Sequence, residues 1–167
     1  MGITGDREFL TGEAGGKTLI DWAVFLSDSL LAASDSRGLL YRKKMNRHDW
    51  ADNVFREGYV TYIEALFCKA LECTGSMLLR LGDPRGRYYT QKAAAVREAI
   101  EEVLWLEDKG WYVNYRSADC IEDNLSIDTA LLAWFHIANR NGPGGCWRTW
   151  SYTLKPKTTA SPLGTGG

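Results

Sequence analysis

The chain has 167 residues, enough for about one domain with a buried core. Its hydrophobic content of 45% and charged content of 25% are typical of a globular protein, and a formal net charge of −1 gives no electrostatic basis for binding nucleic acid or an anionic membrane surface. Seven Trp and eight Tyr raise the aromatic content, which suits sugar stacking and ordinary packing equally.

Metal and membrane sites are not expected. The cysteines and histidines are Cys68, Cys73, Cys120, Cys146, His48 and His136. No two cysteines form a CxxC pair, and two histidines do not supply the spacing of zinc ligands, so we predict no metal and no cofactor. No apolar run reaches ~18 residues without a charge, and no signal-peptide pattern is present. We therefore expect a cytoplasmic protein in a reducing compartment that does not enter a membrane.

The first third of the chain predicts one helix. Residues 1–16 are rich in glycine, and we expect a flexible N-terminal segment unless another part of the protein holds it. Residues 17–33 carry apolar side chains at helical spacing and predict a helix. Gly38 is expected in the turn that ends it, before a short extended piece at residues 39–41.

A polar loop precedes the next helix and contains Asp49, Trp50, Asp52 and Asn53. Such side chains at a helix entrance suit sugar binding. The alternative is structural: the Asp and Asn residues cap and turn the chain, and Trp50 is buried. The helix itself is predicted over residues 59–81.

This second helix is apolar nearly all round, which is typical of a helix buried on most sides. Glu64 is the exception and is either a site residue or the partner of a nearby Arg or Lys, since buried carboxylates need partners. After a Gly-Asp-Pro break, residues 88–105 predict an amphipathic third helix. Residues 111–115 alternate like a short strand.

A second polar loop contains Asp123 and Asn124 and enters a fourth predicted helix over residues 125–138. These two side chains are candidates to bind substrate beside the first loop. Asp128 is expected to stabilise the first turn of the helix.

The chain contains an internal repeat. Gly38 and Gly110 are 72 positions apart, and the Asp-Asn pairs at residues 52–53 and 123–124 are 71 apart. Each unit is predicted to contain an amphipathic outer helix, a Gly turn with a hairpin-like piece, an Asp-Asn loop and a more apolar inner helix. Both loops should then lie at the same end of the molecule.

Residues 140–167 show neither helical nor strand periodicity and are predicted to form an irregular tail. We favour the hypothesis that this tail is translated out of frame. In a shifted frame, the codons from Cys146 onward permit a helix-like start followed by a polar loop, as the repeat would require. The coding DNA tests this hypothesis.

The order of these motifs resembles the six-hairpin glycosidases with an (α/α)6 toroid, and most of all their amylo-α-1,6-glucosidase or glycogen-debranching type. There a Trp-Met-Asp segment precedes an inner helix of the form (I/V)-x-A-L-x-x-x-A-L. Here Trp50-Ala51-Asp52 stands in that place, followed by Tyr62-Ile63-Glu64-Ala65-Leu66. Residues 123–131 resemble the opening of the next inner helix, and the resemblance covers residues 17–139.

The resemblance implies an all-α fold, a partial (α/α)6 toroid of two helical hairpins with short β-hairpin-like insertions. It implies inverting hydrolysis of α-glucosidic linkages in an oligosaccharide or α-glucan, with Asp52 as general acid. Inversion needs a second carboxylate about 6.5–9.5 Å away, which in this family comes from a later part of the chain. We therefore expect a fragment that is inactive by itself and that exposes apolar flanks able to self-associate.

Two alternatives remain from other classes of protein. A non-catalytic helical-repeat scaffold or carbohydrate-binding protein would use the Asp-Asn loops only for structure, although a repeat of 72 residues is long for a solenoid. A sugar epimerase of the toroid type should carry a pair of histidines that His48 and His136 do not supply.

Overall fold

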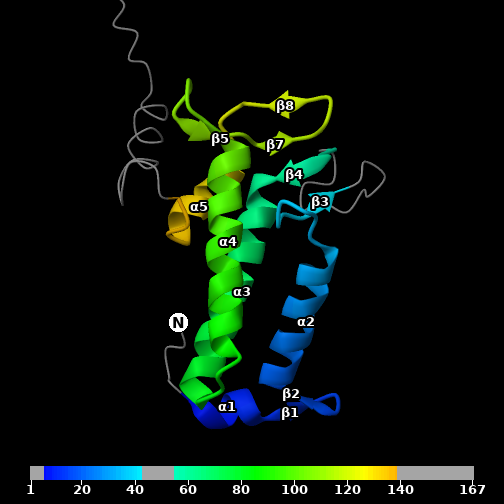
Figure 1. The fold of residues 1–167 in the computed structure, drawn as a ribbon, viewed down its shortest axis with the longest axis vertical. Helices are drawn as coiled ribbons and strands as arrows, with labels where there is room; N and C mark the ends of the chain where they lie inside the picture. Colours follow the sequence, from blue (N-terminus) through cyan, green and yellow to red (C-terminus); the bar gives the residue numbers. More distant parts are fainter. Residues whose placement is uncertain (1–5, 43–54, 139–167) are drawn as a thin grey trace, which may run out of the picture.

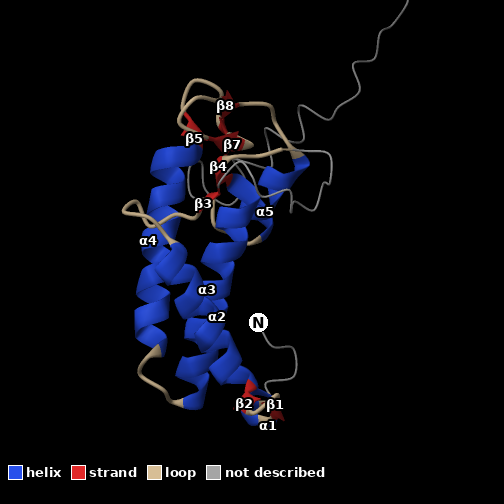
Figure 2. Cartoon of the chain, turned by 90° about the vertical axis from the view of Figure 1, so that its right-hand side faces the viewer, coloured by secondary structure: helices blue, strands red, loops and turns tan. Residues whose placement is uncertain are grey.

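The computed structural model describes residues 6–42 and 55–138. In chain order the elements are α1 (Arg7–Thr11), β1 (Glu13–Ala14), β2 (Lys17–Thr18), α2 (Leu19–Ala33), β3 (Tyr41–Arg42), β4 (Gly58–Val60), α3 (Thr61–Leu81), α4 (Gly86–Leu104), β5 (Trp105–Leu106), β6 (Trp111–Tyr112), β7 (Tyr115–Arg116), β8 (Ile121–Glu122), the 3₁₀ helix η1 (Ile127–Thr129) and α5 (Ala130–Trp134). Figures 1 and 2 show the long helices α2, α3 and α4 side by side, with a small sheet at one end and α1 at the other.

The hairpin of α3 and α4 is the centre of the molecule. Apolar side chains on the facing sides of both helices are buried, as their helical spacing predicts. The two backbones approach closely at Gly75 and Gly86, where a Cβ on Gly86 would lie 2.6 Å from the Gly75 carbonyl oxygen. Any side chain at this crossing would force the helices apart.

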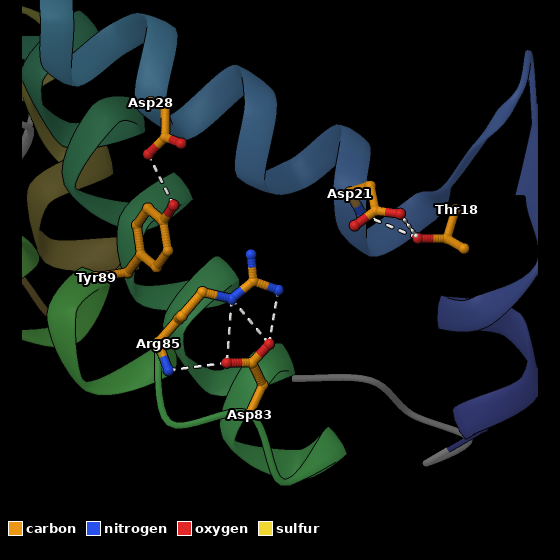
Figure 3. Close-up of polar contacts among 6 residues, drawn as sticks. All are labelled: Thr18, Asp21, Asp28, Asp83, Arg85 and Tyr89. Atoms are coloured by element: carbon orange, nitrogen blue, oxygen red, sulfur yellow. Dashed lines mark hydrogen bonds and ion pairs between the residues drawn. The ribbon is translucent and has the colours of Figure 1, made fainter.

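Helix α2 lies along α3 and is tied to the hairpin by polar contacts. The buried Ser27 and Thr74 hydroxyls are hydrogen-bonded at 2.9 Å, and the Tyr89 hydroxyl donates to Asp28 at 2.7 Å (Figure 3). The opposite side of α2 exposes Phe25 and Leu26. This is the kind of exposed apolar flank that the sequence predicts, and self-association through it stays a prediction.

The N-terminal segment forms ordered structure from residue 6. Asp6 caps α1 by accepting the backbone N–H groups of Glu8 and Phe9, and β1 and β2 form a two-residue hairpin. Arg7 donates to the Leu81 carbonyl at 3.2 Å, so another part of the chain helps to hold this segment. Of the helices in the described ranges, none has the length and apolarity needed to cross a bilayer.

A four-stranded antiparallel sheet in the order β3-β4-β7-β8 joins the two repeated units. The pairing of β4 with β7 places Tyr59 opposite Arg116 and Val60 opposite Tyr115. Gly58 permits this close approach, because a Cβ there would lie 2.2 Å from the Arg116 carbonyl oxygen and its φ of +82° favours glycine. The sheet therefore brings together segments that are far apart in the sequence.

The predicted all-α fold of two helical hairpins from a toroid is wrong. Within residues 6–42 and 55–138 there are eight strands in three sheets, and only three of the five α-helices are long. The second unit has no long inner helix: η1 and α5 together span residues 127–134 instead of the predicted 125–138. The strands β3, β4, β7 and β8 connect the two units, whereas β1–β2 and β5–β6 are local hairpins.

Helix α5 stops early because His136 adopts a left-handed conformation, with φ of 57°. The N–H of His136 bonds to the Ala133 carbonyl and that of Ile137 to the Leu132 carbonyl, which is the hydrogen-bond pattern of a Schellman motif. Leu132 and Ile137 are both fully buried beside it. Sequence patterns did not predict this end because glycine usually occupies the left-handed position.

We expect His136→Gly to raise the free energy of unfolding by about 0.5–1 kcal/mol, because glycine adopts a positive φ without strain. Urea unfolding measures the change. Ala32→Gly, at an exposed position inside α2, is the control and should lower stability by about 1 kcal/mol. A destabilising His136→Gly would mean that contacts of the imidazole ring outweigh the backbone strain.

Candidate functional site

Two of the site residues predicted from the sequence, Asp123 and Asn124, lie at the end of the helices that carries the four-stranded sheet (Figure 1). Asp49, Trp50, Asp52 and Asn53 lie outside the described residues. The chain enters that loop from β3 and returns from it into β4, and these two strands pair with each other. The second loop follows β8 of the same sheet.

Asp123 and Asn124 lie directly after β8 and bond to near neighbours. The Asp123 carboxylate forms an ion pair with Lys109, and its backbone carbonyl accepts the indole N–H of Trp111 at 2.8 Å. The Asn124 amide donates to Glu122. Asp123 is part-exposed and Asn124 is exposed, so both could still accept a ligand hydroxyl.

A buried ion pair connects the two repeated units beside these loops. The Arg56 guanidinium lies 2.5 Å from the Asp128 carboxylate, and the two side chains are only 4% and 8% exposed. Arg56 also lies over the ring of Tyr62, 5.4 Å from its centre.

This pair was missed by the sequence analysis, which assigned Asp128 to the first turn of its own helix. One signal was available: Arg56 and Asp128 are 72 positions apart, the spacing of the repeat. Charges so far apart in the sequence can pair here because the four-stranded sheet joins the two units.

Glu64, in the first turn of α3, is fully buried. Both carboxylate oxygens face the backbone N–H of Leu40, at 3.0 and 3.2 Å. Pairing with Arg or Lys, one of the two alternatives that the sequence left open, is not found within the part of the chain that the structure describes. Burial raises the pKa of Glu64 to about 8; the Leu40 N–H lowers it in part, and the charge of Asp35 raises it further. Glu64 is therefore protonated near neutral pH.

Asp35 and Tyr59 form a hydrogen-bonded pair next to Glu64. The Asp35 carboxylate accepts the Tyr59 hydroxyl at 2.5 Å and the backbone N–H groups of Arg37 and Leu39. Burial acts to raise the pKa of Asp35, but these hydrogen bonds outweigh it and the pKa is lowered. Burial and the Asp35 carboxylate raise the pKa of Tyr59 to about 12. Asp35 is thus ionised and Tyr59 neutral.

The two glycines of the sequence repeat adopt the same backbone conformation. Gly38 and Gly110 both adopt positive φ values, 78° and 74°. Each ends a turn that follows a long helix, α2 and α4 respectively; Gly38 leads to β3 of the four-stranded sheet and Gly110 to β6 of the β5–β6 hairpin.

These groups could bind a polar, uncharged ligand more readily than an ion. Among the described residues, no three side chains of His, Cys, Asp or Glu gather as metal ligands. The carboxylates of Asp35, Asp123 and Asp128 are each compensated by a hydroxyl or a cation. What the described part of this end offers is aromatic rings, amides and hydrogen-bonded carboxylates, which suit hydroxyl groups.

No protein-family model matches the chain, and no curated protein matches it. Its fold is similar to part of a rhamnosidase from Klebsiella oxytoca with rhamnose bound, with a TM-score of 0.66, 15% identity, and coverage of 81% of this chain and 26% of that one. It is also similar to part of the GH78 family rhamnosidase of Bacillus sp. GL1, with a TM-score of 0.64, 21% identity, and coverage of 90% and 16%.

Identities this low establish the fold alone. The chain spans about a quarter of the first rhamnosidase and about a sixth of the second. The predicted likeness to glycosidases is confirmed at the level of fold, while the glycogen-debranching type is not confirmed.

Proposed function

We propose that the chain is part of a glycoside hydrolase and supplies one side of a carbohydrate-binding site at the sheet end of the helices. The observation that carries the proposal is the fold, which is shared with parts of two rhamnosidases. The position of the second Asp-Asn loop and of Trp111 at this end adds support, because aromatic rings and amides are the groups that bind sugars.

In this proposal Asp52 is the general acid that protonates the leaving-group oxygen of an α-glycosidic bond. Trp50 stacks on a sugar ring, and Asp49, Asn53, Asp123 and Asn124 bond to its hydroxyls. The reaction is inverting and needs a second carboxylate to activate water, supplied by a part of the enzyme outside this chain.

Two substrate classes follow from different observations. The resemblance of the sequence motifs favours α-glucosidic linkages, and the two solved structures of similar fold are rhamnosidases by name. The experiment therefore tests both substrate classes. The purified chain is titrated with maltose, isomaltose and L-rhamnose, and binding is monitored by nuclear magnetic resonance.

We expect weak, saturable binding of one of these sugars and no turnover of 4-nitrophenyl α-D-glucoside or α-L-rhamnoside. Asp52→Asn should bind as the parent does, because the amide keeps the shape and loses only the acid. Trp50→Ala should bind more weakly, because it removes the stacking surface. Lack of binding of every sugar would contradict the proposal and favour a structural role for the loops.

A further inference from the structure

One row of side chains crosses all four strands of the sheet. Tyr41 of β3 lies opposite Tyr59 of β4, Tyr59 lies opposite Arg116 of β7, and Arg116 lies opposite Ile121 of β8. Directly opposite residues of antiparallel strands point to the same side of a sheet, so these side chains share one face. With a strand spacing of about 4.8 Å, the row is about 14 Å wide. We call it the tyrosine–arginine face.

The centre of this face is buried and its two ends are open. Tyr41 and Ile121 are 40% and 50% exposed, whereas Tyr59 between them is buried. The rings of Tyr41 and Tyr59 meet edge to face at 5.1 Å, and Asp35 fixes Tyr59 through its hydroxyl. Tyr41 is therefore an exposed aromatic ring on a rigid support, which lowers the entropy lost when a ligand packs against it.

Arg116 lies between the open ends and has no hydrogen-bond or ion-pair partner for its side chain among the described residues. Its Nε is fully buried. The Oδ1 of Asn114, in the bend directly before β7, is also buried without a hydrogen-bond partner among the described residues. A buried donor and a buried acceptor left unbonded are costly, so this pair favours a ligand that offers both an acceptor and a donor.

We infer that the tyrosine–arginine face binds one neutral sugar ring. Neighbouring hydroxyls accept from the Arg116 guanidinium and donate to the Asn114 Oδ1, while an apolar side of the ring lies on Tyr41. A hydroxyl meets both needs because it is at once a donor and an acceptor. The ionised Asp35 next to Tyr59 disfavours an anionic ligand. This inference rests on the proposed function and specifies where the sugar lies.

The test is a titration of the ¹⁵N-labelled chain with methyl α-L-rhamnopyranoside and, separately, methyl α-D-glucopyranoside. We expect saturable shifts of the Arg116 Nε–H, the Asn114 side-chain amide and the neighbouring backbone amides. Arg116→Lys, which keeps the charge and removes the Nε–H, should weaken binding about tenfold or more. Tyr41→Ala should also weaken it, by several-fold.

The control variants lie on α4 at the other end of the molecule. Tyr88→Ala matches Tyr41→Ala, because Tyr88 is 47% exposed and packs edge to face on Tyr89 at 5.2 Å. Arg87→Lys matches Arg116→Lys at an exposed position. Both controls should bind the glycoside as the parent chain does.

Shifts confined to Asp123 and Asn124 would overturn this inference and leave the proposed function standing. No shift anywhere with either glycoside would overturn both. Unchanged affinity in a folded Tyr41→Ala variant would also remove the face from the site. If Arg116→Lys does not fold, the resonance of the Nε–H group in the parent chain still decides, because it stays in place as sugar is added unless the sugar binds beside Arg116.

Discussion

Glu64→Gln is expected to make the folded protein more stable than the parent above about pH 8 and to flatten the parent's pH dependence below it. Glu64 is fully buried with one backbone N–H as its hydrogen-bond partner among the described residues. Glutamine keeps an acceptor for Leu40 and carries no charge at any pH. Urea unfolding at a series of pH values measures the effect.

The sign follows from the pKa of Glu64, which burial raises from 4.5 to about 8 in the folded state. The folded protein then binds a proton that the unfolded chain has lost. The stability this gives is fully present below about pH 4.5 and is lost as the pH rises through about 8. At 1.36 kcal/mol for each pKa unit, the loss is of the order of 3–5 kcal/mol.

Glu72→Gln is the matched control on the same helix. The Glu72 carboxylate is part-exposed and pairs with Lys69 and Arg97. Its replacement should lower stability slightly and leave the slope between pH 5 and pH 8 as in the parent. An unchanged slope in Glu64→Gln would show that Glu64 is ionised in the folded protein at neutral pH.

Breaking the Arg56–Asp128 pair is expected to lower the free energy of unfolding by about 3–5 kcal/mol. Asp128→Asn removes the carboxylate charge that lies 2.5 Å from the Arg56 guanidinium, where the Arg56 side chain is only 4% exposed. Replacing both partners, as Arg56→Met with Asp128→Leu, should recover most of the loss because no charge remains to be desolvated. Chemical denaturation of the three proteins measures these differences.

Asp123→Asn supplies the exposed counterpart. It breaks the ion pair between Lys109 and Asp123, whose side chains are 35% and 43% exposed. The free energy of unfolding should fall by less than about 1 kcal/mol. Equal losses for Asp128→Asn and Asp123→Asn would contradict the assignment of the Arg56–Asp128 pair as the connection between the units.

The long helices could be predicted because their signals are local. Apolar periodicity placed them at residues 17–33, 59–81 and 88–105, and they span residues 19–33, 61–81 and 86–104. The sheet could not be predicted in this way. Its strands are two or three residues long, and the pairing of β4 with β7 joins positions more than 50 residues apart. Nothing in such short segments specifies a distant partner.

The candidate site was predictable only in part, for a related reason. The repeat and the composition of the loops indicated Asp123 and Asn124, which follow the last strand of the sheet. The residues that fix this end, Arg56 and Glu64, act through contacts with Asp128 and Leu40 that local sequence patterns do not contain. Burial by distant segments decides which charges are paired and which are neutral.

The lengths of α3 and α4 also determine how the strands β4 and β7 are aligned. The chain leaves the sheet after Val60, runs out along 21 helical residues and back along 19, and returns to place Tyr115 opposite Val60. Each helix is about 30 Å long at 1.5 Å per residue. Removing one turn from a single helix would draw Arg116 away from Tyr59, while removing one turn from both would preserve their alignment. The alignment of the tyrosine–arginine face thus depends on the similar lengths of two helices that run away from it, 21 and 19 residues.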